Sequence, residues 1–185
     1  MQPIVFEAFA EDCTITGRVT MFGERLTDFL NGQHRFRLNH VVCHSLTDGH
    51  EVSVDSLSVE RSDLLVVIAN GPRGSEKQRI SMQTARLQVH IGPYLILGRL
   101  HTEPGSDVMA SVHKREPMIP LTNVTIAYEH ADAIVARDIP TVIVNRMLVD
   151  WITPTTDAAT VFPDVEVRSP FTARLFKDFT GTSGF

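Results

Sequence analysis

The sequence predicts an all-β protein made of two tandem small β-barrel or β-roll repeats, each with one short helix, followed by a C-terminal tail. Apolar and polar residues alternate with period 2 over residues 13–20, 52–59 and 85–91, which is typical of half-buried strands. The passage Ile15-Thr-Gly-Arg-Val19 returns as Ile96-Leu-Gly-Arg-Leu100, which indicates an internal duplication. Hydrophobic residues make up 43% of the chain, which is enough for a packed core.

The first repeat is expected to contain one short helix among its strands. Leu26, Phe29 and Leu30 stand at positions i, i+3 and i+4, so they would form one apolar side of that helix. Asn31-Gly32 would end it, because both residues tolerate the left-handed conformation of a helix C-terminus. Asp48-Gly49 indicates a hairpin between two of the strands. The strands are expected at residues 4–9, 13–20, 36–46, 52–59 and 64–69.

The second repeat follows a linker and restarts the same plan. Alternation over residues 85–91 breaks at Gly92-Pro93, and Gly105 to Val112 echoes the first helix. The offset between matching residues grows from 81 (Gly17, Gly98) through 82 (Gly23, Gly105) and 83 (Leu38, Leu121) to 85 (Arg61, Arg146), as small loop insertions would produce. We expect the repeats to be related by a pseudo-two-fold axis. The units are a first repeat at 1–69, a linker at 70–79, a second repeat at 80–152 and a tail at 153–185.

Three short motifs carry a family resemblance. The first repeat contains Arg25-Leu-Thr-Asp-Phe-Leu-Asn31, and the second contains Met118-Ile-Pro-Leu-Thr-Asn-Val124 and Val142-Ile-Val-Asn-Arg146. They resemble a small bacterial β-domain family of unknown function, and the resemblance covers most of residues 13–152. It implies a small β-domain with a short helix in each repeat and implies no catalytic residue.

Each repeat departs from this family pattern where the other keeps it. Pro120 of the second repeat is Arg37 in the first, and Asn31 of the first is His113 in the second. The strand-rich plan is also similar to Sm-like small barrels, which assemble through strand edges; this likeness is at the level of the fold alone.

Charge and composition limit the partners and the compartment. The net charge is −5 and the Lys and Arg residues are scattered, which disfavours a nucleic-acid partner. Residues 1–7 lack the pattern of a secretory signal, and no apolar run approaches the roughly 20 residues that span a bilayer. Cys13 and Cys43 are expected to remain buried thiols rather than form a disulfide. We therefore predict a cytoplasmic protein with no membrane contact.

Two sets of residues are candidates for small-ligand binding. On a strand His40 and His44 would share one face, and His50 could join them across the hairpin to hold zinc. The alternative is that these histidines line a solvated face. We expect no metal and no cofactor, because a histidine pair lacks the ligand count of a structural site. Arg18 and Arg99, each beside a glycine, could bind an anion, or form a salt bridge or cover a strand edge.

The tail is expected to dock rather than to stay solvated. It holds five of the ten phenylalanines, whereas disordered segments are poor in aromatic residues. Val165 to Arg168 alternates like a short strand, and residues 171–179 fit one or two helical turns. Docking would be on the protein's own barrels or on a neighbouring subunit. The residues expected to dock are Phe171, Leu175, Phe176 and Phe179.

The predicted function is non-enzymatic. No paired carboxylates, Gly-x-Ser-x-Gly elbow or phosphate-binding loop is evident in the sequence. We interpret the chain as a binding or scaffolding module that acts through protein–protein contacts, as an oligomer, with another protein or a second copy of itself as partner. The alternative is a small-ligand- or metal-binding protein that uses the His40 and His44 face, and an enzyme ranks third.

Overall fold

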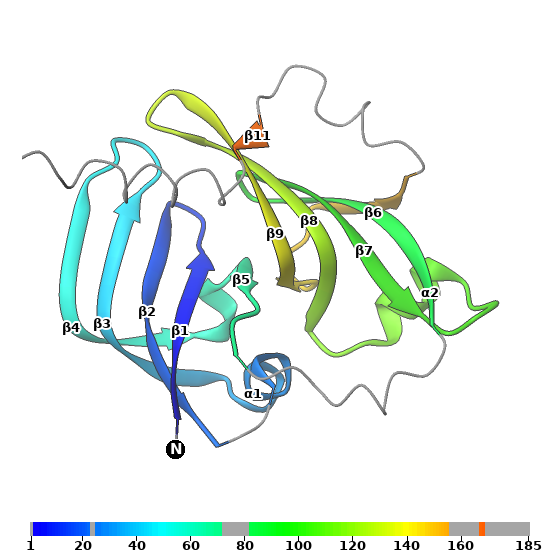
Figure 1. The fold of residues 1–185 in the computed structure, drawn as a ribbon, viewed down its shortest axis with the longest axis horizontal. Helices are drawn as coiled ribbons and strands as arrows, with labels where there is room; N and C mark the ends of the chain where they lie inside the picture. Colours follow the sequence, from blue (N-terminus) through cyan, green and yellow to red (C-terminus); the bar gives the residue numbers. More distant parts are fainter. Residues whose placement is uncertain (1, 23–24, 72–81, 156–166, 169–185) are drawn as a thin grey trace, which may run out of the picture.

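The computed structural model describes residues 2–22, 25–71, 82–155 and 167–168, and over these residues the predicted all-β class is confirmed (Figure 1). The first half holds β1 (Gln2–Phe9), β2 (Cys13–Met21), α1 (Leu26–Gly32), β3 (Arg35–Ser45), β4 (Glu51–Glu60), the 3-10 turn η1 (Arg61–Asp63) and β5 (Val66–Ile68). The second half holds β6 (Gln83–Ile91), β7 (Tyr94–Thr102), α2 (Val108–Lys114), β8 (Met118–His130), β9 (Ala133–Asn145) and β10 (Trp151–Pro154), and β11 (Val167–Arg168) follows.

Ten strands form one antiparallel path in the order β10-β6-β7-β8-β9-β5-β1-β2-β3-β4, and this path is not closed into a barrel. Figure 1 shows two bent half-sheets side by side, with β5 between them. Because β5 pairs with both β1 and β9, the two halves share one sheet. We call the region where β9, β5 and β1 meet the seam. The expectation of closed barrels is not confirmed.

The two halves have the same order of elements and the same strand neighbours. Each runs strand, strand, helix, strand, strand, and ends with a strand that returns to its own first strand: β5 to β1, and β10 to β6. A two-fold axis would bring the same strand of each half to the seam, whereas β9 meets β5. A two-fold axis through the seam is therefore excluded, and the halves follow one another in one direction along the sheet. A two-fold relation that includes a shift along the sheet stays a prediction. The common ancestry of the halves stays a prediction as well.

The glycine shared by the two repeated motifs lies opposite a β-bulge. The register of β2 against β3 shifts beside Gly17, and that of β7 against β8 shifts beside Gly98. On the facing strands His40 and Asn123 have positive φ angles of 50° and 49°. A Cβ on Gly17 would lie 3.2 Å from a β3 carbonyl oxygen, and one on Gly98 would lie 2.9 Å from a valine methyl of β8. The close approach of the strands therefore favours glycine at both positions, and most strictly at Gly98.

The first helix buries the side that its spacing predicted. Leu26, Phe29 and Leu30 are all buried in α1. The helix ends at Gly32 as expected, but not through a left-handed residue: the capping residue Gln33 is extended and its N–H donates to the Phe29 carbonyl (3.0 Å). Two turns of helix are marginal alone, so α1 is held by docking.

The second helix is short as well. The Asp107 carboxylate accepts a hydrogen bond from the Ala110 N–H (2.6 Å), as an N-cap does, and Val112 is buried.

The hydrophobic side chains form two clusters, and each cluster draws on both halves. The cluster under the second half includes Phe9, Leu65 and Val66 of the first. The cluster under the first half includes Met118 and Ile143 of the second. Residues 1–69 and 80–152, which we expected to be separate units, therefore share their cores across the seam.

The β8–β9 hairpin extends from the second half onto the first. Its two turn residues, Ala131 and Asp132, both have positive φ angles (48° and 61°), as a two-residue type I′ turn requires. The Ala131 N–H donates to the Leu46 carbonyl of the first half (2.9 Å). On β9, Ala136 pairs in parallel with Val167 of β11, within the strand expected at residues 165–168.

Candidate functional site

The seam is built on β5, whose three residues face β9 in antiparallel register. Val66, Val67 and Ile68 lie opposite Val144, Ile143 and Val142, and all six are buried. One further hydrogen bond at each end extends the ladder: Ala69 N–H to the Thr141 carbonyl (3.0 Å), and Asn145 N–H to the Leu65 carbonyl (2.9 Å). The seam is thus a continuous piece of sheet between two compact halves.

Asn31 fixes helix α1 to the second half. Its side-chain nitrogen donates to the Met118 carbonyl (3.0 Å), and its side-chain oxygen accepts from the Met118 N–H (2.9 Å). One amide therefore satisfies both main-chain groups of the first residue of β8. Phe29 of the same helix and Met118 both belong to the hydrophobic cluster under the first half.

Asn145 makes the reciprocal contact from the second half to the first. It is 3% exposed, and its side-chain nitrogen donates to the carbonyls of Arg61 (3.2 Å) and Leu64 (3.1 Å). Its side-chain oxygen accepts from the Met147 N–H (3.3 Å). Asn145, the asparagine of the Val-Asn-Arg motif, thus holds the end of β9 against η1.

Two arginines at corresponding positions of the two halves hydrogen-bond to main-chain carbonyl groups at or just after the ends of α1 and α2. Arg61 Nη1 donates to the Asn31 carbonyl at the end of α1 (3.1 Å), and its Nη2 contacts Nδ1 of His34 (3.3 Å). Arg146 Nε donates to the carbonyls of Arg115 (2.8 Å) and Glu116 (3.1 Å), just after α2. Both arginines satisfy carbonyl groups that a helix end leaves without partners.

Aromatic side chains of both halves pack together beside the seam. The ring of Phe9 packs edge-on against Tyr94 (5.3 Å between centroids) and Tyr128 (5.6 Å). The Tyr94 hydroxyl donates to the Ala10 carbonyl (2.6 Å), and burial raises the pKa of this phenol, so it remains a donor. Because Phe9 and Ala10 belong to the first half and both tyrosines to the second, this cluster orients the halves.

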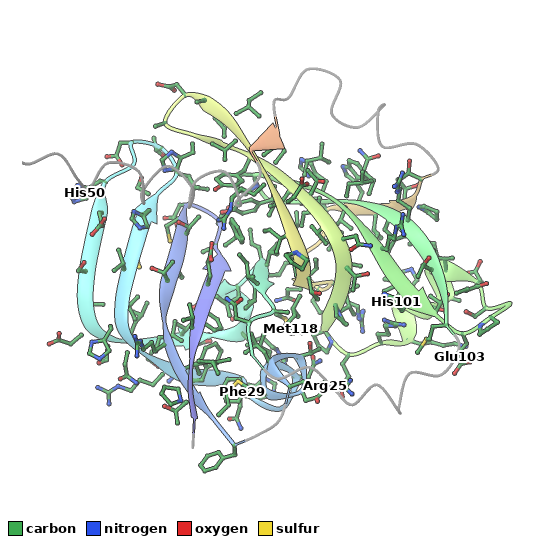
Figure 2. All side chains as sticks on the ribbon, viewed as in Figure 1. Arg25, Phe29, His50, His101, Glu103 and Met118 are labelled. Carbon is green, nitrogen blue, oxygen red and sulfur yellow. The ribbon has the colours of Figure 1, made fainter. Side chains whose placement is uncertain are left out.

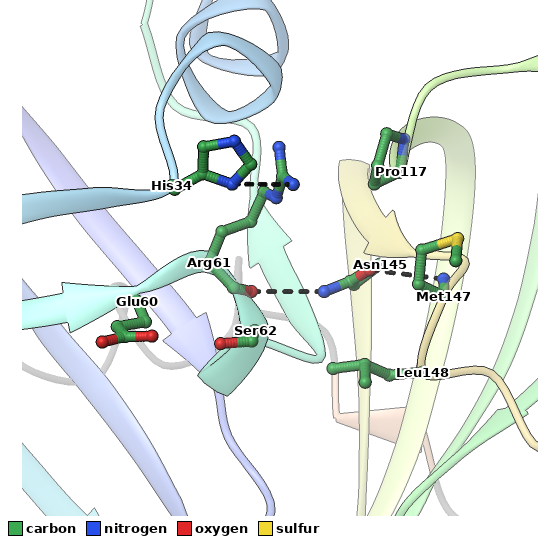
Figure 3. A pocket seen from close by; sticks show the side chains of 8 residues that line it. All are labelled: His34, Glu60, Arg61, Ser62, Pro117, Asn145, Met147 and Leu148. Atoms are coloured by element: carbon green, nitrogen blue, oxygen red, sulfur yellow. Dashed lines mark hydrogen bonds between the residues drawn. The ribbon is translucent and has the colours of Figure 1, made fainter.

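An open hollow of about 180 Å³ lies beside the seam (Figure 3). It is smaller than the roughly 300–1,000 Å³ of common small-molecule sites. The polar groups of Arg61 and Asn145 in its wall already hydrogen-bond within the protein (Figure 3). The hollow is therefore part of the joint between the halves. Its lining residues are His34, Glu60, Arg61, Ser62, Pro117, Asn145, Met147 and Leu148.

The two ends of the sheet path are edge strands. Within the described residues, β4 pairs only with β3, and β10 pairs only with β6. Large apolar side chains are exposed on both: Val52 (50%) and Val54 (40%) on β4, and Trp151 (43%) on β10. Unpaired edges with apolar side chains are templates for the addition of another strand.

Trp151 is held in place at its edge. Its ring stacks on His90 (centroids 5.6 Å apart, planes 10° apart). Asp150 fixes this pair, because one of its carboxylate oxygens is 3.0 Å from Nδ1 of His90 and accepts from the Gly92 N–H (2.9 Å). The β10 edge thus presents a pre-oriented aromatic side chain.

The three histidines proposed as zinc ligands do not come together. His40 lies in the bulge, which interrupts the alternation assumed for it and His44. Nδ1 of His44 is 3.7 Å from Glu51, and His50 is exposed at the start of β4, far from the seam (Figure 2). Over the described residues, no three metal-ligating side chains form a group. A ligand-binding role for the His40 and His44 face stays a prediction.

The other predicted sites have different outcomes. Arg18 and Arg99 are exposed, one beside each bulge, on different halves. Cys13 and Cys43 are free and half-buried rather than buried, and burial raises the pKa of both thiols. The tail residues Phe171, Leu175, Phe176 and Phe179 lie outside the described residues.

β10, the strand that forms one of the two open edges of the sheet, was not predicted from the sequence. Residues 64–69 were expected to be a buried strand, and β5 confirms this. Its counterpart β10 was not expected, because Trp151 and Ile152 were placed at the end of the second repeat. The offset of 85 that links Arg61 to Arg146 also links Val66 to Trp151, and this signal could have located the strand.

Comparisons of the chain with protein-family models, curated proteins and solved structures return no match. Among the described residues, no helix has the length and hydrophobicity needed to cross a membrane.

Proposed function

We propose that this chain is a non-enzymatic scaffolding module that acts through protein–protein contacts along the open edges of its sheet. The observation that carries the proposal is the exposure of Val54 and Trp151 on the edge strands β4 and β10. An edge strand offers main-chain donors and acceptors, and exposed apolar side chains add affinity when another strand covers them. The seam supports the proposal, since the same kind of strand addition already joins the two halves.

We also propose that each half is a divergent copy of the small β-domain family that its motifs resemble, and that the protein is cytoplasmic. The common order of elements, the matching bulges at His40 and Asn123, and the returning fifth strand support a duplication. In this interpretation the family motifs serve the joint between domains, because Asn31 and Asn145 both bind the main chain of the opposite half.

The proposal is tested by photo-crosslinking in cells that express the full chain. A photo-reactive phenylalanine derivative replaces Val54 on the β4 edge, and the control carries it at Val5. Val5 is 59% exposed, but it lies on β1, an interior strand of the sheet path, and pairs there with Arg18 of β2. We expect discrete protein adducts from position 54 and none from position 5. The same adducts from both positions, or none from either, would contradict a contact along the edge.

A further inference from the structure

The two edges of the molecule correspond to the two strands that meet in its seam. β10 is the counterpart of β5, because each pairs with the first strand of its half in the same register: Val66 faces Phe9, and Trp151 faces His90. The residue before each strand also donates to the same position: Leu65 to the Phe9 carbonyl, and Asp150 to the His90 carbonyl, both at 3.0 Å.

β4 is likewise the counterpart of β9. Leu57 of β4 faces Leu38, and Val142 of β9 faces Leu121 in the same position of its own half. At the seam β9 pairs with β5, whereas in the described residues the outer sides of β4 and β10 meet no strand. The seam is thus one complete joint, formed by two paired strands. The two ends of the sheet path carry the strands that correspond to this pair, β10 and β4, and these could form a second joint of the same kind.

We propose that β10 of one chain pairs with β4 of a second copy, antiparallel, and so repeats the seam between molecules. The seam register, carried over by the offset of 85, places Trp151 opposite Val59, Ile152 opposite Ser58 and Thr153 opposite Leu57. The partner is another copy of this chain because the pairing continues the same sheet through a joint that the fold already contains. This inference rests on the proposed edge function and names its partner and register.

The main-chain groups needed for this pairing point outward. The Thr155 N–H donates to the Arg86 carbonyl of β6, so by antiparallel alternation the groups of Ile152 point away from β6. The Arg61 N–H donates to the His34 carbonyl before β3, so the groups of Ser58 point away from β3. Ile152 and Ser58 can therefore exchange two hydrogen bonds, as facing residues of a hydrogen-bonded pair do.

The joint between molecules is expected to be weaker than the seam. Ser58 replaces the buried Ile143, and Pro154 replaces Ala69, whose N–H donates at the seam. Two side chains that hydrogen-bond across the seam also differ at the corresponding positions of the joint between molecules. His113 corresponds to Asn31, which binds Met118, and Glu60 corresponds to Asn145, which donates to two carbonyls. A carboxylate donates no hydrogen bond to a carbonyl. Pairing between molecules is therefore reversible, whereas the seam is permanent.

Trp151 is the anchor of this joint. Its counterpart at the seam, Val66, is fully buried between β1 and β9, whereas Trp151 is 43% exposed and already stacked on His90. Pairing with β4 would cover the indole beside Val59. Tryptophan is among the residues that contribute most to binding when they are buried at an interface.

The contact joins two different surfaces, so it does not stop at two copies. A two-fold contact would use β4 with β4 or β10 with β10 and would end at a dimer. Pairing of β10 with β4 leaves one free edge of each kind on the growing assembly, and it ends only when a ring closes. The mass of the assembly therefore separates the two arrangements.

The first test measures the mass of the purified full chain by light scattering over a concentration series. We expect species larger than a dimer in the wild type. Ser58→Pro removes only the outward N–H of an edge strand, where proline is tolerated, and should weaken association about tenfold. Ser58→Ala keeps that N–H and should associate like the wild type. A wild type that stays monomeric at all concentrations, stops at a dimer, or is unchanged by Ser58→Pro overturns the proposal.

The second test does not depend on the folding of the proline variant. Chains carrying Ser58→Cys and chains carrying Ile152→Cys are mixed and oxidised. Facing residues of a hydrogen-bonded pair have Cα atoms about 5.5 Å apart, which suits a disulfide. We expect a covalent pair in the mixture, and none in either variant alone or in the wild type with Cys13 and Cys43. Pairs of Ser58→Cys with itself would indicate a two-fold contact and overturn the register.

The two proposals fail in different ways. If the purified chain is monomeric and yet Val54 crosslinks to another protein in cells, the head-to-tail pairing is wrong and the edge function stands. If neither a second copy nor another protein is found on the β4 edge, the edge function fails as well. If the chain's own tail covers β4, Ser58→Pro leaves the mass unchanged, and this also overturns the pairing.

Discussion

Replacing Asn145 with alanine is expected to lower the free energy of unfolding by about 2–3 kcal/mol. The side chain is 3% exposed and makes three hydrogen bonds, to the carbonyls of Arg61 and Leu64 and from the N–H of Met147. Each is worth roughly 0.5–1.5 kcal/mol net. The loss stays in the middle of the summed range, because the 3.3 Å bond from Met147 is weak and the open hollow beside Asn145 lets water reach the groups left behind.

Glu60 provides the matched control for this measurement. It occupies the same position as Asn145 in the first half, and its side chain is 47% exposed in an ion pair with Arg35. An exposed ion pair is worth roughly 0–1 kcal/mol, so Glu60→Ala should change stability by less than about 1 kcal/mol. Urea unfolding of the wild type and both variants, followed by fluorescence and circular dichroism, gives the comparison. Equal losses in the two variants would refute the role assigned to Asn145.

The same prediction has a consequence for cooperativity. Because each hydrophobic cluster contains side chains of both halves, the two halves should unfold together in the wild type. Fluorescence reports mainly on Trp151 in the second half, and circular dichroism reports on the whole sheet. The two transitions should coincide. Transitions that separate already in the wild type would contradict the shared cores.

Three further predictions concern positions inside each half. Leu38→Ala and Leu121→Ala should each lower stability by roughly 2–5 kcal/mol in urea unfolding, because both leucines are fully buried; a loss below about 1 kcal/mol in either would contradict matching core positions. Gly98→Ala should cost roughly 1–3 kcal/mol in the same assay, since the added Cβ would lie 2.9 Å from a Val124 methyl, and an unchanged midpoint would argue against the close approach. Burial raises the pKa of Cys13 to about 12, so the free energy of unfolding should fall as the pH rises from about 9 towards 12. For the same reason, a thiol reagent at pH 8 should label Cys13 far more slowly in the native protein than in the urea-unfolded protein. Equal labelling rates would refute this prediction.

Much of the fold was predictable because strand periodicity and helix spacing are local signals. The buried residues of α1 and the buried strand β5 follow directly from such patterns. The arrangement of the two halves was not predictable, because the order of strands along the chain does not determine the neighbours of a short strand. The three residues of β5 decide the arrangement by pairing with β1 on one side and β9 on the other.

The candidate site was less predictable for a related reason. His40 and His44 drew attention because histidine is a metal ligand, but the bulge at His40 breaks the alternation on which that site depended. Conversely, Asn31 looked like a helix terminator, and its actual task is to bind both main-chain groups of Met118, 87 positions away. A contact between distant segments leaves no local pattern, and the motif resemblance alone marked the residue as unusual.

The seam accounts for two differences between the halves, at Asn31 against His113 and at Asn145 against Glu60. Asn31 lies on the helix that contacts the opposite half at the seam, whereas its counterpart His113 is exposed on α2, in the half that ends the sheet path at β10. Asn145 is present on the half whose β9 enters the seam, and its counterpart Glu60 lies on the outer edge strand. At each position the hydrogen-bonding amide occurs where the joint is internal, and an ionisable side chain occurs where the joint would be between molecules. Under the proposed pairing, these differences between the two halves distinguish a permanent joint at the seam from a reversible one at the open edges, and the seam sets the geometry against which the reversible joint has to be tested.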